Sequence, residues 1–176
     1  GDGDGDGGNG DDDPGGDGDG DPGSDETLTV TSTSTDPSET ECTLIQAIEA
    51  ANADEARGGC PAGNGADTIV LQEGEVYEFS EAYDDFDGPT ALPSITSEIT
   101  IEGNGASIQG FERESHEDPF FRLLHVASGG DLTLNDVTVA KGYTPVSPFR
   151  DDDIPRGAGL HVAAGGKATL TNTRWT

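Results

Sequence analysis

Positively charged residues are scarce in this 176-residue chain. Lys and Arg number 8 against 36 Asp and Glu, so the formal net charge is -28. Binding to duplex DNA or to an anionic membrane surface requires positive charge, and neither is an expected partner. Salt or Ca²⁺ outside the cell would screen the repulsion between so many acidic groups. A solvated, solubilising surface is the favoured explanation of the acidity, and adaptation to a high-salt habitat is the alternative.

Long apolar runs are missing as well. No stretch approaches the roughly 18 apolar residues that a membrane span requires, so no span is predicted. The chain also has no Met and no signal peptide, and it begins at Gly1 as a mature or trimmed product would. Export must therefore be argued from other features.

Cysteine is limited to Cys42 and Cys60. The two do not form a C-x-x-C pair, and the nearest histidine is His116, so the sequence gives poor support for a zinc site. A disulfide is the favoured interpretation, and two unrelated buried thiols are the alternative. A disulfide would stabilise the fold by about 3 kcal/mol on the chain-entropy model. It would also place the protein in an oxidising compartment.

Residues 1–25 form a segment rich in Asp and Gly that we expect to be a disordered acidic linker. Residues 1–26 contain 11 acidic residues and no basic one. Apart from its prolines the linker has no apolar side chain, so burial cannot offset the entropy lost on ordering. Glycine makes such a segment flexible, and repulsion between its aspartates extends it.

Residues 26–66 are predicted to form an N-terminal cap that contains one helix. Apolar residues recur at helical spacing over residues 43–54. Thr43 is a suitable N-cap residue, and Gly58 and Gly59 are expected to terminate the helix.

Residues 67–176 consist of short β segments separated by Gly or Asn. Residues 125–134 (HVASGGDLTL) align without gaps with residues 161–170 (HVAAGGKATL), at an offset of 36. A weaker copy begins at residues 99–104 (ITIEGN). Repetition of this kind is typical of solenoids, in which each unit pairs its strands with the next. The sequence therefore predicts an all-β fold, a right-handed parallel β-helix with an N-terminal capping α-helix.

The two ends of this predicted stack differ. The helix over residues 43–54 is placed to cover the first apolar edge, whereas the chain ends at Thr176 partway through a repeat. We therefore expect the coils of residues 67–176 to be truncated at the C-terminus. Residues 143–156 (YTPVSPFRDDDIPR) lengthen one repeat and are expected to project as a loop.

Six segments carry a resemblance to a known family: residues 28–33 (LTVTST), 42–52 (CTLIQAIEAAN), 59–69 (GCPAGNGADTI), 92–95 (LPSI), 99–103 (ITIEG) and 157–162 (GAGLHV). Together they resemble the CSLREA-type N-terminal domain of secreted right-handed parallel β-helix proteins of bacteria and archaea. The resemblance covers about residues 27–175, and it implies a capped parallel β-helix that is exported or displayed on the cell surface. The Arg-Glu pair of the family is Ile45-Gln46 here, so the salt bridge of that pair is absent and the helix is expected to dock more by burial.

Calcium is the one cofactor for which the sequence offers candidates, and they are weak. Asp2, Asp4, Asp6 and Asp13 follow the spacing of a calcium-binding loop, in which oxygen ligands alternate along the chain. The ninth position of that loop is a glycine, and no helix flanks it. A solvated linker is the favoured interpretation, and weak, non-stoichiometric Ca²⁺ binding is the alternative.

Polysaccharide cleavage is the catalytic candidate, by analogy with other parallel β-helices. Such lyases combine acidic Ca²⁺ ligands with a basic residue that abstracts a proton. The residues of this kind lie in or near loop 143–156: Lys141, Arg150, Asp151, Asp152, Asp153 and Arg156. A solvated charge run remains the favoured interpretation.

Two further groups contain histidine. Residues 112–118 (ERESHED) combine carboxylates with His116, but a polar connecting loop is the favoured interpretation. His125 and His161 occupy equivalent positions of the repeat. We expect them to stack as neighbours in a packing role, with a metal site as the alternative.

We therefore expect an extracellular or cell-surface β-helix module with a structural, adhesive or glycan-contact role and no evident catalysis. Extracellular polysaccharides or surface proteins are the expected partners. The alternative is the N-terminal part of a carbohydrate-active enzyme, a Ca²⁺-dependent polysaccharide lyase or a glycoside hydrolase, whose site lies in loop 143–156 or beyond the C-terminus. A calcium-dependent surface assembly module is a third hypothesis.

Overall fold

The structure, a computed structural model, describes residues 26–85, 87–115, 118–144 and 158–176. It contains one helix, α1 (Leu44–Ala53), and eleven short strands within these ranges. The strands are β1 (Thr27–Thr29), β2 (Ala66–Val70), β3 (Val76–Phe79), β4 (Glu98–Glu102), β5 (Ser107–Gly110), β6 (Leu124–Val126), β7 (Asp131–Asn135), β8 (Thr138–Ala140), β9 (Leu160–Val162), β10 (Lys167–Thr171) and β11 (Arg174–Trp175).

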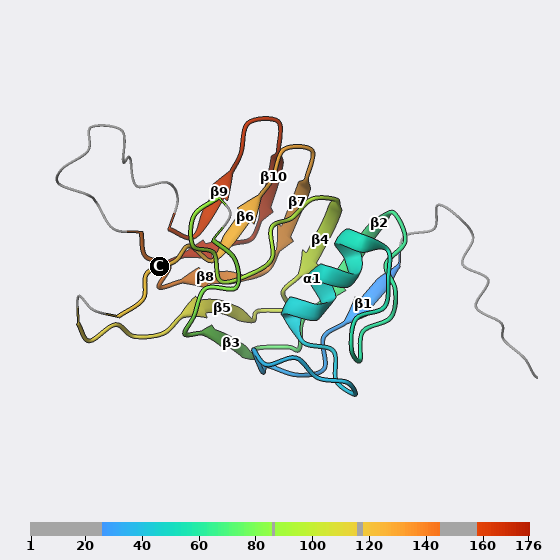
Figure 1. The fold of residues 1–176 in the computed structure, drawn as a ribbon, viewed down its shortest axis with the longest axis horizontal. Coiled ribbons are helices and arrows are strands. Elements are labelled where there is room, and N and C mark those ends of the chain that lie inside the picture. Colours follow the sequence, from blue (N-terminus) through green and yellow to red (C-terminus); the bar gives the residue numbers. More distant parts are fainter. Residues whose placement is uncertain (1–25, 86, 116–117, 145–157) are drawn as a thin grey trace, which may run out of the picture.

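The strands form three parallel sheets (Figure 1). The first sheet has the order β1-β2-β4-β7-β10, and the second has the order β11-β8-β5-β3. The third contains β6 and β9 alone. Every pair of neighbouring strands within these sheets is parallel. From β4 onward the chain passes through the first, second and third sheets in turn, after β1 and β2 have both joined the first sheet.

The register of the first sheet aligns apolar side chains into inward-facing columns. One column consists of Leu28, Ile69, Ile101, Leu134 and Leu170, on successive strands. The first four are fully buried. Residues on either side of each of these positions point outward, because successive side chains of a strand alternate between the two faces of a sheet. The first sheet thus has a largely apolar inner face and a largely polar outer face.

The repeat at an offset of 36 is confirmed as strand pairing. β7 pairs with β10 so that Asp131 lies opposite Lys167, and β6 pairs with β9 so that His125 lies opposite His161. The weaker copy is confirmed too, since Ile99 of β4 lies opposite Leu132 of β7. Equivalent sequence positions therefore lie at equivalent places on neighbouring strands.

The prediction of an all-β, right-handed parallel β-helix is wrong. The fold is mixed: residues in strands and isolated bridges make up 39% of the described residues, one short helix is present, and no closed barrel or solenoid is found in the part of the chain that the structure describes. The repeat predicted which strands pair. Strand pairing between units does not by itself determine whether the sheets are connected into the closed coils of a solenoid. Helix α1 also belongs to the core, where six of its ten residues are buried.

Helix α1 begins and ends where predicted, within residues 43–54, but the predicted glycines do not terminate it. The Thr43 side chain accepts a hydrogen bond from the Gln46 backbone N–H, which makes Thr43 the N-cap. The helix ends at Asp54, whose left-handed conformation (φ 51°) directs its N–H to the Ala50 carbonyl. Gly58 and Gly59 lie beyond that end, so they do not terminate the helix. Figure 1 shows α1 beside β1, β2 and β4, the strands against which it packs.

The predicted disulfide between Cys42 and Cys60 is present, and both residues are almost fully buried. It joins the residue just before the N-cap of α1 to the segment that follows the helix. No helix among the described residues has the length and apolar character of a membrane span.

Candidate functional site

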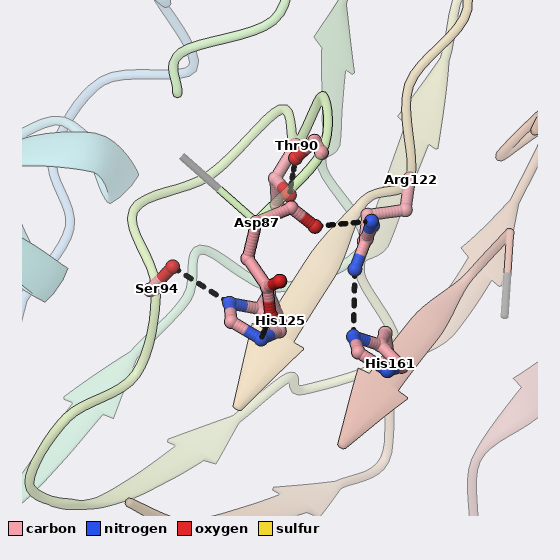
Figure 2. Close-up of polar contacts among 7 residues, drawn as sticks. Asp87, Thr90, Ser94, Arg122, His125 and His161 are labelled. Carbon is pink, nitrogen blue, oxygen red and sulfur yellow. Dashed lines mark hydrogen bonds and ion pairs between the residues drawn. The ribbon is translucent and has the colours of Figure 1, made fainter. Parts of the chain in front are cut away.

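A group of interacting polar side chains lies where β6 and β9 meet the segment that leads into Ser94 (Figure 2). Two histidines come from the strands, Arg122 comes from the chain just before β6, and Asp87 and Ser94 come from the overlying segment. We call Asp87, Ser94, Arg122, His125 and His161 the histidine cluster.

The two histidines stack as the repeat predicted. Their ring centroids are 5.2 Å apart and their planes differ by 10°. Parallel pairing of β6 with β9 produces this arrangement, because residues in register project side by side. His125 is 3% exposed, whereas His161 is half-buried. The predicted stacking of the two rings is thereby confirmed, and each imidazole also has polar partners.

Both ring nitrogens of His125 lie close to oxygen atoms. Nδ1 is 2.8 Å from the Ser94 hydroxyl oxygen, and Nε2 is 3.0 Å from Asp87 Oδ2. Nε2 is buried, but its contact with Asp87 does not have the geometry of a hydrogen bond. Burial lowers the pKa of His125, Arg122 lowers it further, and Asp87 opposes them. A neutral imidazole with its proton on Nε2 faces the carboxylate and accepts from Ser94 at Nδ1.

Arg122 connects the second histidine to the segment above it. Its Nη1 donates to His161 Nδ1 (2.7 Å), and its Nη2 donates to the Asp87 carbonyl oxygen (2.6 Å). An arginine is always a donor, so Nδ1 of His161 accepts and its proton lies on Nε2. The adjacent Gly88 has a φ of +91°, and a Cβ there would lie 2.5 Å from Arg122 Nη2. Glycine is therefore required for the approach of this segment to the guanidinium.

Ser94, His125 and Asp87 form a chain of the kind that activates a serine nucleophile, but its geometry does not suit that chemistry. In a hydrolase the carboxylate is buried and the serine faces the substrate. Here the Asp87 side chain is half-exposed, and the histidine between the two residues is the buried member. The cluster is better suited to holding the overlying segment or to binding an ion. Asp87, His125 and His161 offer ligand atoms within 4.8 Å of one another.

A second candidate surface is the outer face of the first sheet. Five threonines occupy successive strands in one register column: Thr27, Thr68, Thr100, Thr133 and Thr169. All five side chains are partly or fully exposed. At a strand spacing of about 4.8 Å the column is about 19 Å long. We call it the threonine column.

Charged and amide side chains lie on both sides of the threonine column. Asp131 pairs with Lys167 on one side, with 2.9 Å between Oδ2 and Nζ. On the other side the Asn135 amide donates to Glu102 (2.7 Å). These pairs join β7 to its two neighbours, so the outer face carries hydroxyl, carboxylate and amide groups at fixed spacing.

A third region is a cavity of about 390 Å³ beside α1, lined by residues 35–36, Ile45 and residues 79–83. Tyr83 donates a hydrogen bond from its hydroxyl to Glu49 of α1. Burial raises the pKa of Tyr83 to about 12, and the neighbouring Glu49 carboxylate adds to the shift. The contact attaches this segment to the helix.

Most of the predicted site residues lie outside the described part of the chain. This holds for the calcium candidates Asp2, Asp4, Asp6 and Asp13, and for Arg150, Asp151, Asp152, Asp153 and Arg156 of the lyase hypothesis. Lys141 is described: its ammonium lies 3.2 Å from Glu112, and its backbone is left-handed (φ 57°). Lys141 therefore forms an ion pair with a residue that the lyase hypothesis did not include.

The segment 112–118 is described except for residues 116 and 117. Asp118 accepts hydrogen bonds from the backbone N–H groups of Glu114 and Ser115, and these bonds lower its pKa. Arg113 donates to the Asp118 carbonyl oxygen and lies over the ring of Tyr143, 4.3 Å from its centroid. The carboxylate of Asp118 thus closes a turn, as expected of a polar connecting segment.

Sequence reasoning found the two histidines and missed their partners. Asp87, Ser94 and Arg122 lie outside the aligned repeat, so no periodic signal marked them. The threonine column did leave a signal, because Thr133 and Thr169 are equivalent positions of the aligned repeat.

Comparison with known proteins assigns no family to this chain. No protein-family model matches it, and neither a curated protein nor a solved structure is significantly similar to it.

Proposed function

We propose that this chain is an exported structural module that contacts extracellular glycan through the outer face of its first sheet. The single observation that carries the proposal is the threonine column. Its hydroxyl groups both donate and accept hydrogen bonds, as the hydroxyl groups of a polysaccharide do. A rigid sheet orders them in advance, which reduces the entropy cost of binding.

The export part of the proposal rests on the disulfide. Disulfides form and persist in oxidising compartments, which include the exterior of the cell. The Cys42–Cys60 bond is buried within the cap, so it belongs to the folded structure. An extracellular or cell-surface location accounts for this bond together with the strongly acidic composition.

The charge of the chain favours a neutral polysaccharide as the ligand. A net charge of -28 repels polyuronates at low ionic strength, unless a divalent cation bridges the two. Each threonine hydroxyl is expected to contribute about 1 kcal/mol to binding. Affinity should therefore be modest for a short oligosaccharide and higher for a polymer that spans the whole column.

Affinity electrophoresis in gels containing cellulose- or chitin-derived soluble polysaccharides tests the proposal. We expect a neutral polymer to retard the chain, and Thr100→Ala with Thr133→Ala to remove most of the retardation. Thr138→Ala, a partly exposed threonine of the second sheet, is the matched control and should behave as the parent chain does. Equal retardation of all three proteins, or none of any of them, would refute glycan contact at this face.

Cleavage of polysaccharide remains an unsupported alternative. Apart from Lys141, its candidate residues lie outside the described ranges, and Lys141 pairs with Glu112. Unsaturated products from an acidic polysaccharide incubated with the chain and Ca²⁺ would favour the lyase over the binding module.

A further inference from the structure

We propose that Asp87, His125 and His161 form a binding site for a divalent transition-metal ion, with Zn²⁺ as the reference ion. This inference is independent of glycan contact, since the histidine cluster and the threonine column use different residues. Two observations carry it. The three ligand atoms lie within 4.8 Å of one another, and the buried Nε2 of His125 has no well-directed hydrogen bond.

The chemistry of the donor set selects the class of metal. Two imidazoles with one carboxylate suit Zn²⁺ and its first-row neighbours, whereas Ca²⁺ prefers six to eight oxygen ligands. Metal–ligand distances of about 2.1 Å place tetrahedral ligand atoms about 3.4 Å apart. His125 Nε2 and Asp87 Oδ2 are already 3.0 Å apart, so the approach of about 1 Å that the ion requires concerns His161 and its two partners.

Asp87 is the group best placed to adjust its position when the ion binds. Its side chain is half-exposed and comes from an irregular segment, whereas the histidines belong to paired strands. Asp84 is close enough to act electrostatically on His125. The exposed side of the cluster thus gives the ion a path from solvent past acidic groups that attract cations.

Ser94 is suited to the role of outer partner of the bound ion. A histidine that binds metal through Nε2 carries its proton on Nδ1 and donates it to a neighbouring acceptor. The Ser94 hydroxyl lies 2.8 Å from that nitrogen. A hydroxyl can accept as well as donate, so both tautomers of His125 find a partner and the buried ring can change tautomer in place.

Arg122 is the competitor of the ion. It donates to His161 Nδ1, which holds the proton of that ring on Nε2. Ligation through Nε2 moves the proton to Nδ1, where it would confront a guanidinium that can only donate. Binding to His161 therefore requires Arg122 to withdraw, and its positive charge also opposes the ion. Removing the charge of Arg122 should therefore tighten metal binding, whereas removing one of the three ligand side chains should weaken it.

Calorimetric titration of the full chain with ZnCl₂, after treatment with a chelator and without a polyhistidine tag, tests the site. We expect one histidine-dependent site per chain. Asp87→Asn and His161→Gln should weaken it more than 10-fold, and Ser94→Ala about 10-fold. Arg122→Gln should tighten it several-fold, since a glutamine offers an acceptor to His161 Nδ1–H.

Two controls separate this site from loose binding to the many carboxylates. His116→Ala removes the remaining histidine of the chain and should leave the affinity unchanged, and CaCl₂ should not compete with Zn²⁺ at equal concentration. Thermal unfolding without metal shows whether each variant folds, and the exposed Asp87→Asn keeps the test valid if a histidine variant does not. Zn²⁺ affinity that is the same in the parent, Asp87→Asn and His161→Gln proteins would overturn the proposal, as would weaker binding by Arg122→Gln.

Discussion

The two ends of the first sheet differ in how completely they bury the same kind of side chain. At the first strand, Leu28 is fully buried, and helix α1 packs against β1 and β2. At the last strand, Leu170 occupies the same inner column and is 44% exposed. Trp175 of β11 and Val162 of β9 are exposed to a similar degree.

The difference shows that the pattern of the sequence and the burial of a residue are separate properties. Leu134 and Leu170 occupy equivalent positions of the repeat and pair in register, yet Leu134 is fully buried. Leu134 has a neighbouring strand on each side, whereas Leu170 lies on the edge strand β10 and has one on a single side. The predictions below test this dependence on cover.

The largest expected effect comes from the register pair itself. Leu134→Ala should lower the free energy of unfolding by about 3 kcal/mol, because a buried leucine leaves both lost burial and a cavity. Leu170→Ala, its matched control, should cost less than about 1 kcal/mol, because that side chain is already half in solvent. Urea unfolding followed by circular dichroism measures both. Equal losses of free energy of unfolding for the two variants would mean that the end of the sheet at β10 is covered in solution.

The disulfide should have the next largest effect on the free energy of unfolding, and it lies beside α1, at the covered end of the first sheet. Replacing Cys42 and Cys60 together by serine is expected to lower the free energy of unfolding by about 3 kcal/mol, since it releases the constraint on the unfolded chain. Reductant should have the same effect on the parent chain and none on the double variant. A parent chain whose urea midpoint ignores reductant would contradict this.

Gln46 tests whether burial alone docks α1. Its amide donates to the Ser38 carbonyl (2.8 Å) and its carbonyl accepts from the Ser38 N–H (3.2 Å). Gln46→Ala should cost about 1–2 kcal/mol, because it leaves both partners without those bonds. Gln109→Ala, which removes an exposed bond to Glu78, is the matched control and should cost under about 0.5 kcal/mol. If Gln46→Ala and Gln109→Ala lost similar amounts of free energy in urea unfolding, the hydrogen bonds of Gln46 would not contribute to the docking of α1, and burial alone would account for it.

The sequence allowed the local elements and their pairing to be predicted, because both depend on patterns that repeat. The N-cap at Thr43 and the parallel pairing at an offset of 36 are examples. It did not allow the fold class to be predicted, because closure depends on connections with no period. The terminating residue was predicted wrongly, since a non-glycine residue, Asp54, adopts the left-handed conformation at the end of the helix.

The candidate site was predictable only in its repeated part. The His125–His161 stack followed from the alignment, whereas Asp87 reaches the cluster from an irregular segment between β3 and β4. Gln46 was expected to weaken the polar docking of α1 because it replaces a charged residue of the resembled family. Its neutral amide instead both donates and accepts, a property that charge counting does not detect.

Asp67 lies on β2, near the end of the first sheet that α1 covers, and it provides a pH test of that end. It is buried in the inner column of Ile99, Leu132 and Ala168, and its Oδ2 has no hydrogen-bond partner. Burial raises its pKa, and the charges of Asp54 and Glu26 add to the shift, against a hydrogen bond from Asn64.

The protonated carboxyl therefore stabilises the fold at low pH, and this contribution is lost as the pH rises through the raised pKa. Asp67→Asn should unfold at a higher urea concentration than the parent near pH 7, and the advantage should shrink toward pH 3. Glu98→Gln on the exposed face is the control and should show no such trend. An advantage that grew on acidification would contradict the sign.

The smallest expected effect concerns Tyr83, whose contact with Glu49 attaches the segment beyond β3 to α1. Burial and the carboxylate raise the pKa of Tyr83 to about 12, so its phenolate should form above the ordinary range near 10. Glu49→Gln removes the negative charge and should lower the pKa of Tyr83, with little change in stability because the site is partly exposed. Ultraviolet titration of the parent, Glu49→Gln and Tyr83→Phe proteins isolates this ionisation from those of the other tyrosines. If Glu49→Gln left the Tyr83 titration unchanged, burial alone would account for the raised pKa of Tyr83, and the Glu49 carboxylate would make no contribution to it.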